Sequence, residues 1–165
     1  MKKIIFIVLI LFSCTMSFAQ NFSKLANAEF KSTESFKSSE SQVLICANYL
    51  FSTPADQAEL NRLNAIKYIM NWMQGTPDYT FDIGEKAMKL TNGETDLLGL
   101  YMAAMSKTVI ENTAGKLSSD EMYNQAEKIL VNYCAVADNK MKPSKKIKQL
   151  LKKPNNKLNS VHKKN

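Results

Sequence analysis

Three carboxylates lie close together in the middle of the chain, at Asp78, Asp82 and Glu85, beside the aromatic residues Tyr79 and Phe81. If a helix begins near Phe81, Asp82 and Glu85 lie one turn apart on the same helix face, and Asp78 precedes them in a turn. Paired carboxylates can bind Ca²⁺ or carry out general acid–base chemistry on a sugar. The alternative is that acidic residues collect at a helix N-terminus because the helix dipole favours them there, and no calcium-loop spacing supports a metal site.

Aromatic residues surround the same turn: Tyr68, Trp72, Tyr79 and Phe81. Exposed together, with Trp72 and Tyr79 foremost, they would form a binding patch for a sugar or a peptide. At helical spacing, however, Tyr68 and Trp72 are more often part of the core or of its rim. The sequence leaves both interpretations open.

Histidine chemistry is excluded from the expected folded domain, because the only histidine is His162, near the C-terminus. That excludes Ser-His-Asp and Cys-His catalysis and histidine-ligated zinc in the domain. The sequence contains neither a glycine-rich phosphate loop nor a dinucleotide fingerprint, so it implies no cofactor. An enzyme of this sequence would have to use carboxylates, tyrosines, lysines or a cysteine.

The N-terminal segment has the order of a secretory signal peptide. Lys2 and Lys3 precede the apolar run 4–12, and residues 17–19 place small side chains where a signal peptidase cleaves. The apolar run is about half the roughly 20 residues that span a membrane. We therefore expect a signal peptide over 1–19, cleavage after Ala19 and an exported, periplasmic or secreted protein.

A second interpretation of this segment is a lipoprotein signal. Residues 11–14, ending in Cys14, resemble the bacterial motif in which the cysteine is lipidated and begins the mature chain, although Phe12 departs from it. Cleavage there would give a membrane-anchored protein.

Two cysteines remain after cleavage at Ala19, Cys46 and Cys134. An oxidising compartment permits a disulfide between them. Both also lie among apolar neighbours in expected helices, where a free cysteine behaves as a small buried hydrophobic residue. Their spacing does not match a metal site.

The charge is divided between two parts of the chain. Residues 20–139 contain ten basic and fifteen acidic residues, whereas 140–165 contains ten lysines and no acid. This Lys-rich tail could bind an anionic membrane or an acidic protein, fold back onto the acidic body, or remain solvated. Its candidate binding residues are Lys145, Lys146, Lys148, Lys152 and Lys153. Because Arg62 is the only arginine, sequence-specific nucleic-acid binding is not expected.

The elements that position these residues are all helical. Glycine and proline are scarce and helix-favouring residues are plentiful. We expect a Ser-rich arm or tether over 20–39, a domain of about five helices over 40–139, and a short amphipathic helix inside the Lys-rich tail, followed by disorder. The expected helices cover 40–51, 54–74 after an N-cap at Thr53, 81–90, 95–112, 118–137 and 144–153.

Two helices carry the strongest signals. The segment 95–112 is apolar nearly all round, which predicts a helix at the centre of the bundle. Ser118 and Glu121 form a capping box at the start of the next helix.

In the helix 54–74, the stripe Leu63, Ile66, Met70 and Met73 is expected to face the core. An irregular array of helical pairs, starting near residues 40, 81 and 118, is the alternative to a bundle.

The favoured function is therefore a non-catalytic binding or interaction module of the cell envelope or secreted space. The alternative is a small hydrolase of an envelope polymer that uses Asp78, Asp82 or Glu85 as its acids. The ligand or partner is not specified by the sequence.

Overall fold

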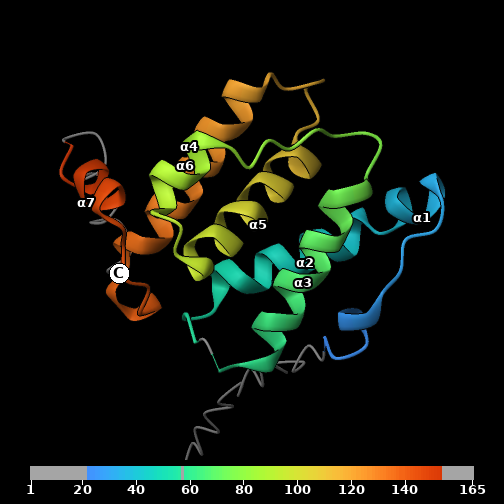
Figure 1. The fold of residues 1–165 in the computed structure, drawn as a ribbon, viewed down its shortest axis with the longest axis horizontal. Coiled ribbons are helices and arrows are strands. Elements are labelled where there is room, and N and C mark those ends of the chain that lie inside the picture. The colour runs from blue at the N-terminus through green and yellow to red at the C-terminus, as the bar shows by residue number, and fades with distance from the viewer. Residues whose placement is uncertain (1–21, 57, 154–165) are drawn as a thin grey trace, which may run out of the picture.

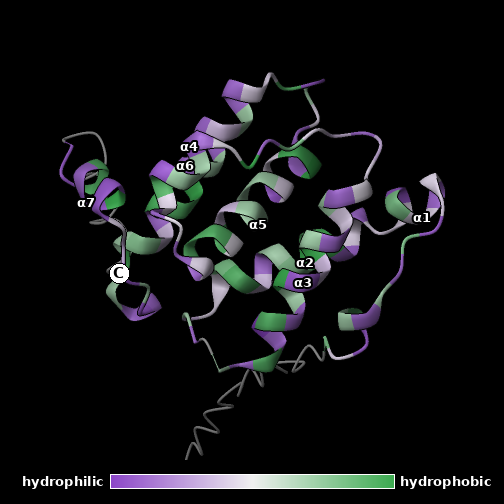
Figure 2. Ribbon diagram, viewed as in Figure 1, coloured by the Kyte–Doolittle hydropathy of each residue, from purple (hydrophilic) through white to green (hydrophobic). Residues whose placement is uncertain are grey.

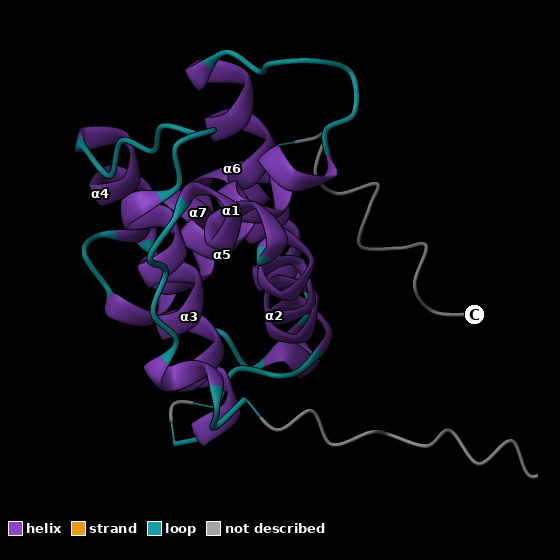
Figure 3. Ribbon diagram, turned by 90° about the vertical axis from the view of Figure 1, so that its right-hand side faces the viewer, coloured by secondary structure: helices purple, strands orange, loops and turns teal. Residues whose placement is uncertain are grey.

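The computed structural model describes residues 22–56 and 58–153, which form helices and connecting loops without a strand (Figures 1 and 3). The predicted all-α fold is confirmed. The expected signal peptide over 1–19, with Cys14, and His162 lie outside the described residues. The elements are η1 (Leu25–Asn27), α1 (Thr33–Ser38), α2 (Glu40–Ser52), α3 (Leu60–Gly75), α4 (Glu85–Thr91), α5 (Thr95–Glu111), α6 (Ser119–Ala135), η2 (Ala137–Asn139) and α7 (Lys145–Leu151).

Helix α5 is the centre of the bundle, as its composition predicts. It packs against α2, α3, α4 and α6, and eleven of its seventeen residues are buried. Figure 1 shows it between the α2–α3 pair and the α4–α6 pair. Elements of a solenoid contact only their neighbours in sequence. Because α2 and α5 are in direct contact, the arrangement is a bundle around α5.

The close approach of α3 to α5 depends on Gly99. A Cβ atom at this position would lie 3.1 Å from Cγ2 of Ile66, closer than nearly all ordinary contacts. Ile66 therefore packs over a part of α5 that has no side chain.

The start of α6 confirms the predicted capping box. The Ser118 hydroxyl accepts a hydrogen bond from the Glu121 amide at 3.3 Å, and the Glu121 carboxylate accepts one from the Ser118 amide at 2.9 Å. The helix ends at Ala135, two residues earlier than expected, so Ala137 lies in η2 and is exposed rather than facing the core.

The expected start of α3 is wrong. Thr53 does not cap this helix, which begins at Leu60 after Glu59. The Glu59 carboxylate accepts hydrogen bonds from the amides of Asn61 and Arg62, both at 2.9 Å, and so satisfies donors that a helix start leaves free. Thr53 lies in the preceding loop because its oxygens accept bonds from Arg62 and Tyr133.

The expected inward face of α3 is also wrong. Leu63 and Met70 are 47% and 37% exposed, and Ile66 and Met73 are half-buried. The buried face is displaced by about one residue and consists of Arg62, Ala65, Tyr68, Ile69 and Trp72. The physical reason is that the rings of Tyr68 and Trp72 must be buried and that the guanidinium of Arg62 must reach the end of α2.

The aromatic residues of the N-terminal arm explain how those rings are covered. Phe30 stacks on Phe36 at 5.0 Å and lies 5.4 Å from Tyr68, measured between ring centroids. Phe22 is buried edge-on against Tyr49. The described part of the arm is thus packed onto α2 and α3.

Candidate functional site

Helix α7 is docked on the body through its apolar side. Ile147 is fully buried and Leu150 is 7% exposed, and the helix packs against α4 and α6. The Ser144 hydroxyl caps the helix by accepting a bond from the Ile147 amide, and it donates to the Leu90 carbonyl oxygen of α4. The predicted amphipathic helix is present, and its apolar stripe is used inside the molecule.

Helix α7 and the two residues that follow it present lysines to solvent. Lys145, Lys146, Lys148, Lys152 and Lys153 are all exposed, and we call them the lysine face. None of them takes part in an ion pair with another described residue. Figure 2 shows α7 at the edge of the molecule, with hydrophilic colour outward. The candidate binding lysines are therefore exposed next to a helix that is anchored to the body.

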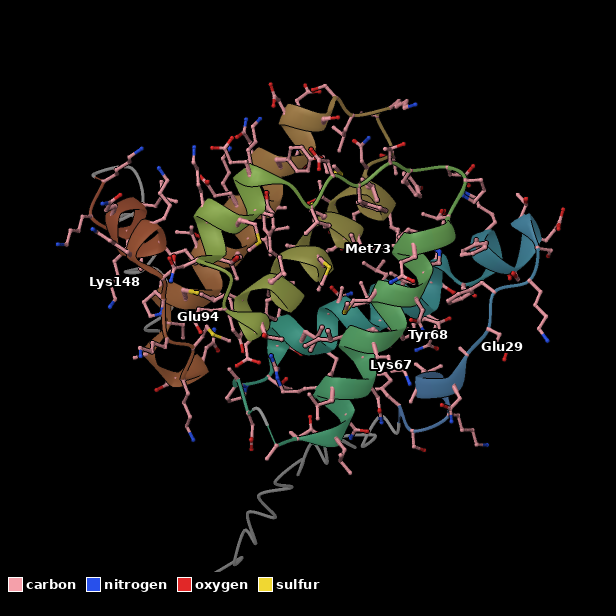
Figure 4. The ribbon with its side chains drawn as sticks, in the orientation of Figure 1. Glu29, Lys67, Tyr68, Met73, Glu94 and Lys148 are labelled. Atoms are coloured by element: carbon pink, nitrogen blue, oxygen red, sulfur yellow. The ribbon has the colours of Figure 1, made fainter. Side chains whose placement is uncertain are left out.

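A groove of about 960 Å³ lies between α7 and the end of α2. Its walls are residues 53–56 with Tyr49 and Glu59, the α4–α5 turn with the start of α5 (Asn92, Glu94, Asp96 and Leu97), and the segment 140–145 with Lys148; Arg62 also lines it. Figure 4 places Lys148 and Glu94 on the same side of the molecule. The groove joins three segments that are distant in sequence.

Arg62 is the most buried charged residue of this groove, at 5% exposure. Its Nη1 donates to the Leu50 carbonyl oxygen at 3.1 Å and to the carbonyl and hydroxyl oxygens of Thr53 at 3.3 and 2.8 Å. Leu50 lies in the last turn of α2, where carbonyl groups lack intrahelical partners. Arg62 therefore closes the end of α2 while its charge remains without an ion pair among the described residues.

Two tyrosines complete the network around Arg62. The Tyr49 hydroxyl donates to the Glu59 carboxylate at 2.6 Å. Burial is the main reason why the pKa of Tyr49 is raised to about 12, and the hydrogen bond and charge of Glu59 add to it. The Tyr133 hydroxyl donates to the Thr53 carbonyl oxygen at 2.7 Å. Burial raises the pKa of Tyr133, and the charge of Arg62 opposes that rise. Both phenols act here as neutral hydrogen-bond donors.

The carboxylates Asp78, Asp82 and Glu85 do not form a paired site. Helix α4 begins at Glu85 rather than near Phe81, so Asp82 and Glu85 do not share a helix face. The Asp82 amide instead donates to the Tyr123 hydroxyl, which holds this segment out of the helix. All three side chains are exposed.

Two of the three carboxylates, Asp78 and Glu85, are paired with lysines. Asp78 lies 3.8 Å from Lys37, and Glu85 lies 2.5 Å from Lys89, whose hydrogen bond and charge lower the pKa of Glu85. A general acid that works at neutral pH needs a raised pKa, and Glu85 is shifted in the opposite direction.

A smaller hollow of about 560 Å³ lies next to the Pro77 turn, between it and the α5–α6 loop. Asp78 and Tyr79 line it, together with Lys116, but Asp82 and Glu85 do not. The hollow therefore contains one carboxylate rather than the pair that glycoside hydrolysis requires.

The prediction that Trp72 belongs to an exposed aromatic binding patch is wrong. Its side chain is fully buried and its Nε1 donates to the Phe36 carbonyl oxygen at 3.0 Å. The ring centroids of Tyr79 and Phe81 lie 5.7 and 6.0 Å from that of Trp72. Tyr79 is half-buried, so this cluster joins the turn to the core.

Cys46 in α2 and Cys134 in α6 are free, buried thiols, rather than the disulfide that the sequence left open. Burial raises the pKa of Cys46 to about 11 and that of Cys134 to about 12. Both cysteines therefore behave as small buried hydrophobic residues, which was the alternative to a disulfide.

Within residues 22–56 and 58–153, no group of three acidic, cysteine or histidine side chains is placed to hold a metal ion. In the same part of the chain, none of the helices combines the length and the apolar composition of a membrane span.

Comparison of the chain with models of protein families, with curated proteins and with solved structures gives no match. The site must therefore be interpreted from its own geometry. The sequence predicts the exposed lysines of the lysine face, but it does not predict the groove or its buried Arg62. One signal in the sequence could have indicated a special role for Arg62: it is the single arginine among 22 lysine and arginine residues.

Proposed function

We propose that this protein is a non-catalytic binding module that attaches to anionic surfaces through the lysine face. The observation that carries the proposal is that five exposed lysines lie in the docked helix α7 and the two residues after it, without an ion-pair partner among the described residues. Like charges repel one another, so a cluster of lysines is unfavourable unless the fold holds it in place. The docking of α7 keeps these lysines near one another.

The anchoring determines how such binding works. A free amphipathic helix binds membranes by burying its apolar side among the lipids. Ile147 and Leu150 are already buried against the body, so α7 has no apolar side left to insert. Attachment is then electrostatic, worth about 1 kcal/mol for each lysine near an anionic surface and strongly reduced by salt.

We further propose that the protein acts outside the cytoplasm, after removal of residues 1–19. The support is the order of charge, apolar run and small residues at the N-terminus. Cleavage after Ala19 gives a mature chain that starts at Gln20, whereas the lipoprotein alternative gives one that starts at lipid-modified Cys14. The intact mass of the protein from its native host distinguishes the two.

The attachment proposal is tested by co-sedimentation of the mature protein with vesicles. We expect binding to vesicles that contain phosphatidylglycerol, no binding to pure phosphatidylcholine vesicles, and release when ionic strength rises from about 0.05 to about 0.5 M. Equal binding to both vesicles, or binding that resists salt, would contradict an electrostatic mode. Point substitutions are preferable to deleting residues 140–165, because deletion also removes Ile147 and Leu150 from the core.

A further inference from the structure

We propose that the groove around Arg62 is a binding site for a small ligand that carries two or more phosphate or carboxylate groups. This inference goes beyond attachment to a surface and does not depend on it. A flat surface can contact exposed lysines, but it cannot reach a guanidinium that is 5% exposed. Only a ligand that enters the groove can use Arg62.

The cations of the groove have free hydrogen-bonding capacity. Lys140, Lys142, Lys145 and Lys148 are exposed and form no ion pair with another described residue. A guanidinium has five N–H donors, and the three bonds described for Arg62 all start at Nη1. The N–H groups of its Nε and Nη2 are those that a bidentate anion could use.

The acids of the groove are outnumbered by its cations, four to five, and three of the four accept hydrogen bonds or take part in another interaction. Both oxygens of Glu59 accept bonds, from two backbone amides and from the Tyr49 hydroxyl. Asp56 accepts from the Ala58 amide, and Asp96 takes part in a further interaction. Glu94 remains as an exposed acid on one side. The lining of the groove therefore carries an excess of positive charge, and its cations have no ion-pair partner among the described residues, which favours an anionic ligand.

The size and layout of the groove favour a ligand with more than one anionic group. Its volume of about 960 Å³ is near the upper end of small-molecule pockets, far more than one phosphate fills. The positive groups are divided between Arg62, which is buried, and the lysines of the segment 140–148, which are exposed. A ligand that spans both positions would satisfy a buried and an exposed cation together.

The single arginine allows a direct test by NMR. Protein labelled with ¹⁵N-arginine gives one Nε–H signal, which belongs to Arg62. We expect pyrophosphate or citrate to shift this signal with a Kd of about 1 mM or tighter, and inorganic phosphate to bind more weakly. The tighter of the two probes distinguishes a phosphate from a carboxylate ligand. An Arg62 signal that stays in place when both probes are present in excess would overturn the proposal.

Matched variants separate the groove from general charge effects. Lys140→Asn with Lys142→Ala removes two charges from the groove; asparagine suits position 140, whose φ is 53°. Lys146→Ala with Lys153→Ala removes two charges from the lysine face outside the groove. We expect the groove variant to weaken binding of the probe about tenfold and the control to change it by less than about twofold. Equal loss in both variants would contradict the proposal, whereas failure of vesicle attachment would leave this result unaffected.

Discussion

The Ser144 hydroxyl donates a 2.5 Å hydrogen bond to the Leu90 carbonyl oxygen and accepts one of 3.1 Å from the Ile147 amide. One buried side chain thus satisfies a carbonyl group in the last turn of α4 and caps the first turn of α7. Because the two helices are joined at this point, Ser144 determines where the lysine face begins relative to the body.

Ser144→Ala should loosen α7. Loss of an N-cap and of a buried hydrogen bond together costs about 1–2 kcal/mol. Hydrogen exchange of the α7 amides should accelerate, and the free energy of unfolding should fall. Ser119→Ala, at an exposed position of α6, is the control and should change neither. Equal exchange of the α7 amides in wild type and Ser144→Ala would show that this bond does not anchor the helix.

Arg62→Met should destabilise the whole bundle. The substitution keeps much of the buried volume but leaves the Leu50 carbonyl oxygen and the Thr53 hydroxyl without the Arg62 donor, at a cost of about 2–4 kcal/mol. Urea unfolding measures the loss. Lys67→Met, at an exposed position of the same helix, should change stability by less than about 0.5 kcal/mol. Similar midpoints for the two variants would mean that Arg62 does not hold the end of α2.

The cysteines should be unreactive in the folded protein. Both thiols are buried and burial raises the pKa of each, so the nucleophilic thiolate is scarce and inaccessible. A thiol reagent at about pH 8 should label neither residue natively and both after unfolding without reductant. Failure to label the unfolded, unreduced chain would indicate a Cys46–Cys134 disulfide.

The same pKa shifts predict a loss of stability at alkaline pH. The fold raises the pKa of Cys46 from 9.0 to about 11, so it favours the neutral thiol. The stabilising contribution is complete below about pH 9 and is lost as pH rises through about 11. Cys134, with a pKa of about 12, adds to the loss over a slightly higher range.

Urea unfolding at successive pH values tests this expectation. Between about pH 9 and 11, the double variant Cys46→Ala with Cys134→Ala should lose stability less steeply than wild type, although it starts lower. The remaining slope comes from buried tyrosines such as Tyr49, whose pKa is raised to about 12. Parallel curves for wild type and the double variant would contradict the account of the thiols.

The sequence predicts the parts of this fold whose signals are local. The ends of α5, the capping box at Ser118 and the helix after Ser144 follow from patterns within a few residues. The start and the face of α3 could not be predicted because both depend on distant partners. Thr53 is bonded by Arg62 and by Tyr133, eighty residues away, and an arginine in the buried face contradicts the usual hydrophobic pattern.

The candidate site also has a part that the sequence predicts and a part that it does not. The lysine face follows from composition and helical period, because its residues are adjacent in sequence. The groove could not be predicted, since its walls come from residues 49–62, 92–97 and 140–148. The paired carboxylates failed because of a distant partner: the Asp82 amide donates to the hydroxyl of Tyr123 in α6, and α4 begins only at Glu85.

On the proposed mode of binding, the position of the lysines, rather than the net charge, drives attachment to an anionic surface. The most direct measurement is the partition of two variants onto phosphatidylglycerol vesicles, each lacking three positive charges. In one, Lys146, Lys152 and Lys153 are changed to glutamine; in the other, Lys67, Lys116 and Lys128, which are exposed on other parts of the body, are changed likewise. We predict that the first variant binds about tenfold or more weakly than wild type, and that the second stays close to wild type. Equal losses would contradict the claim.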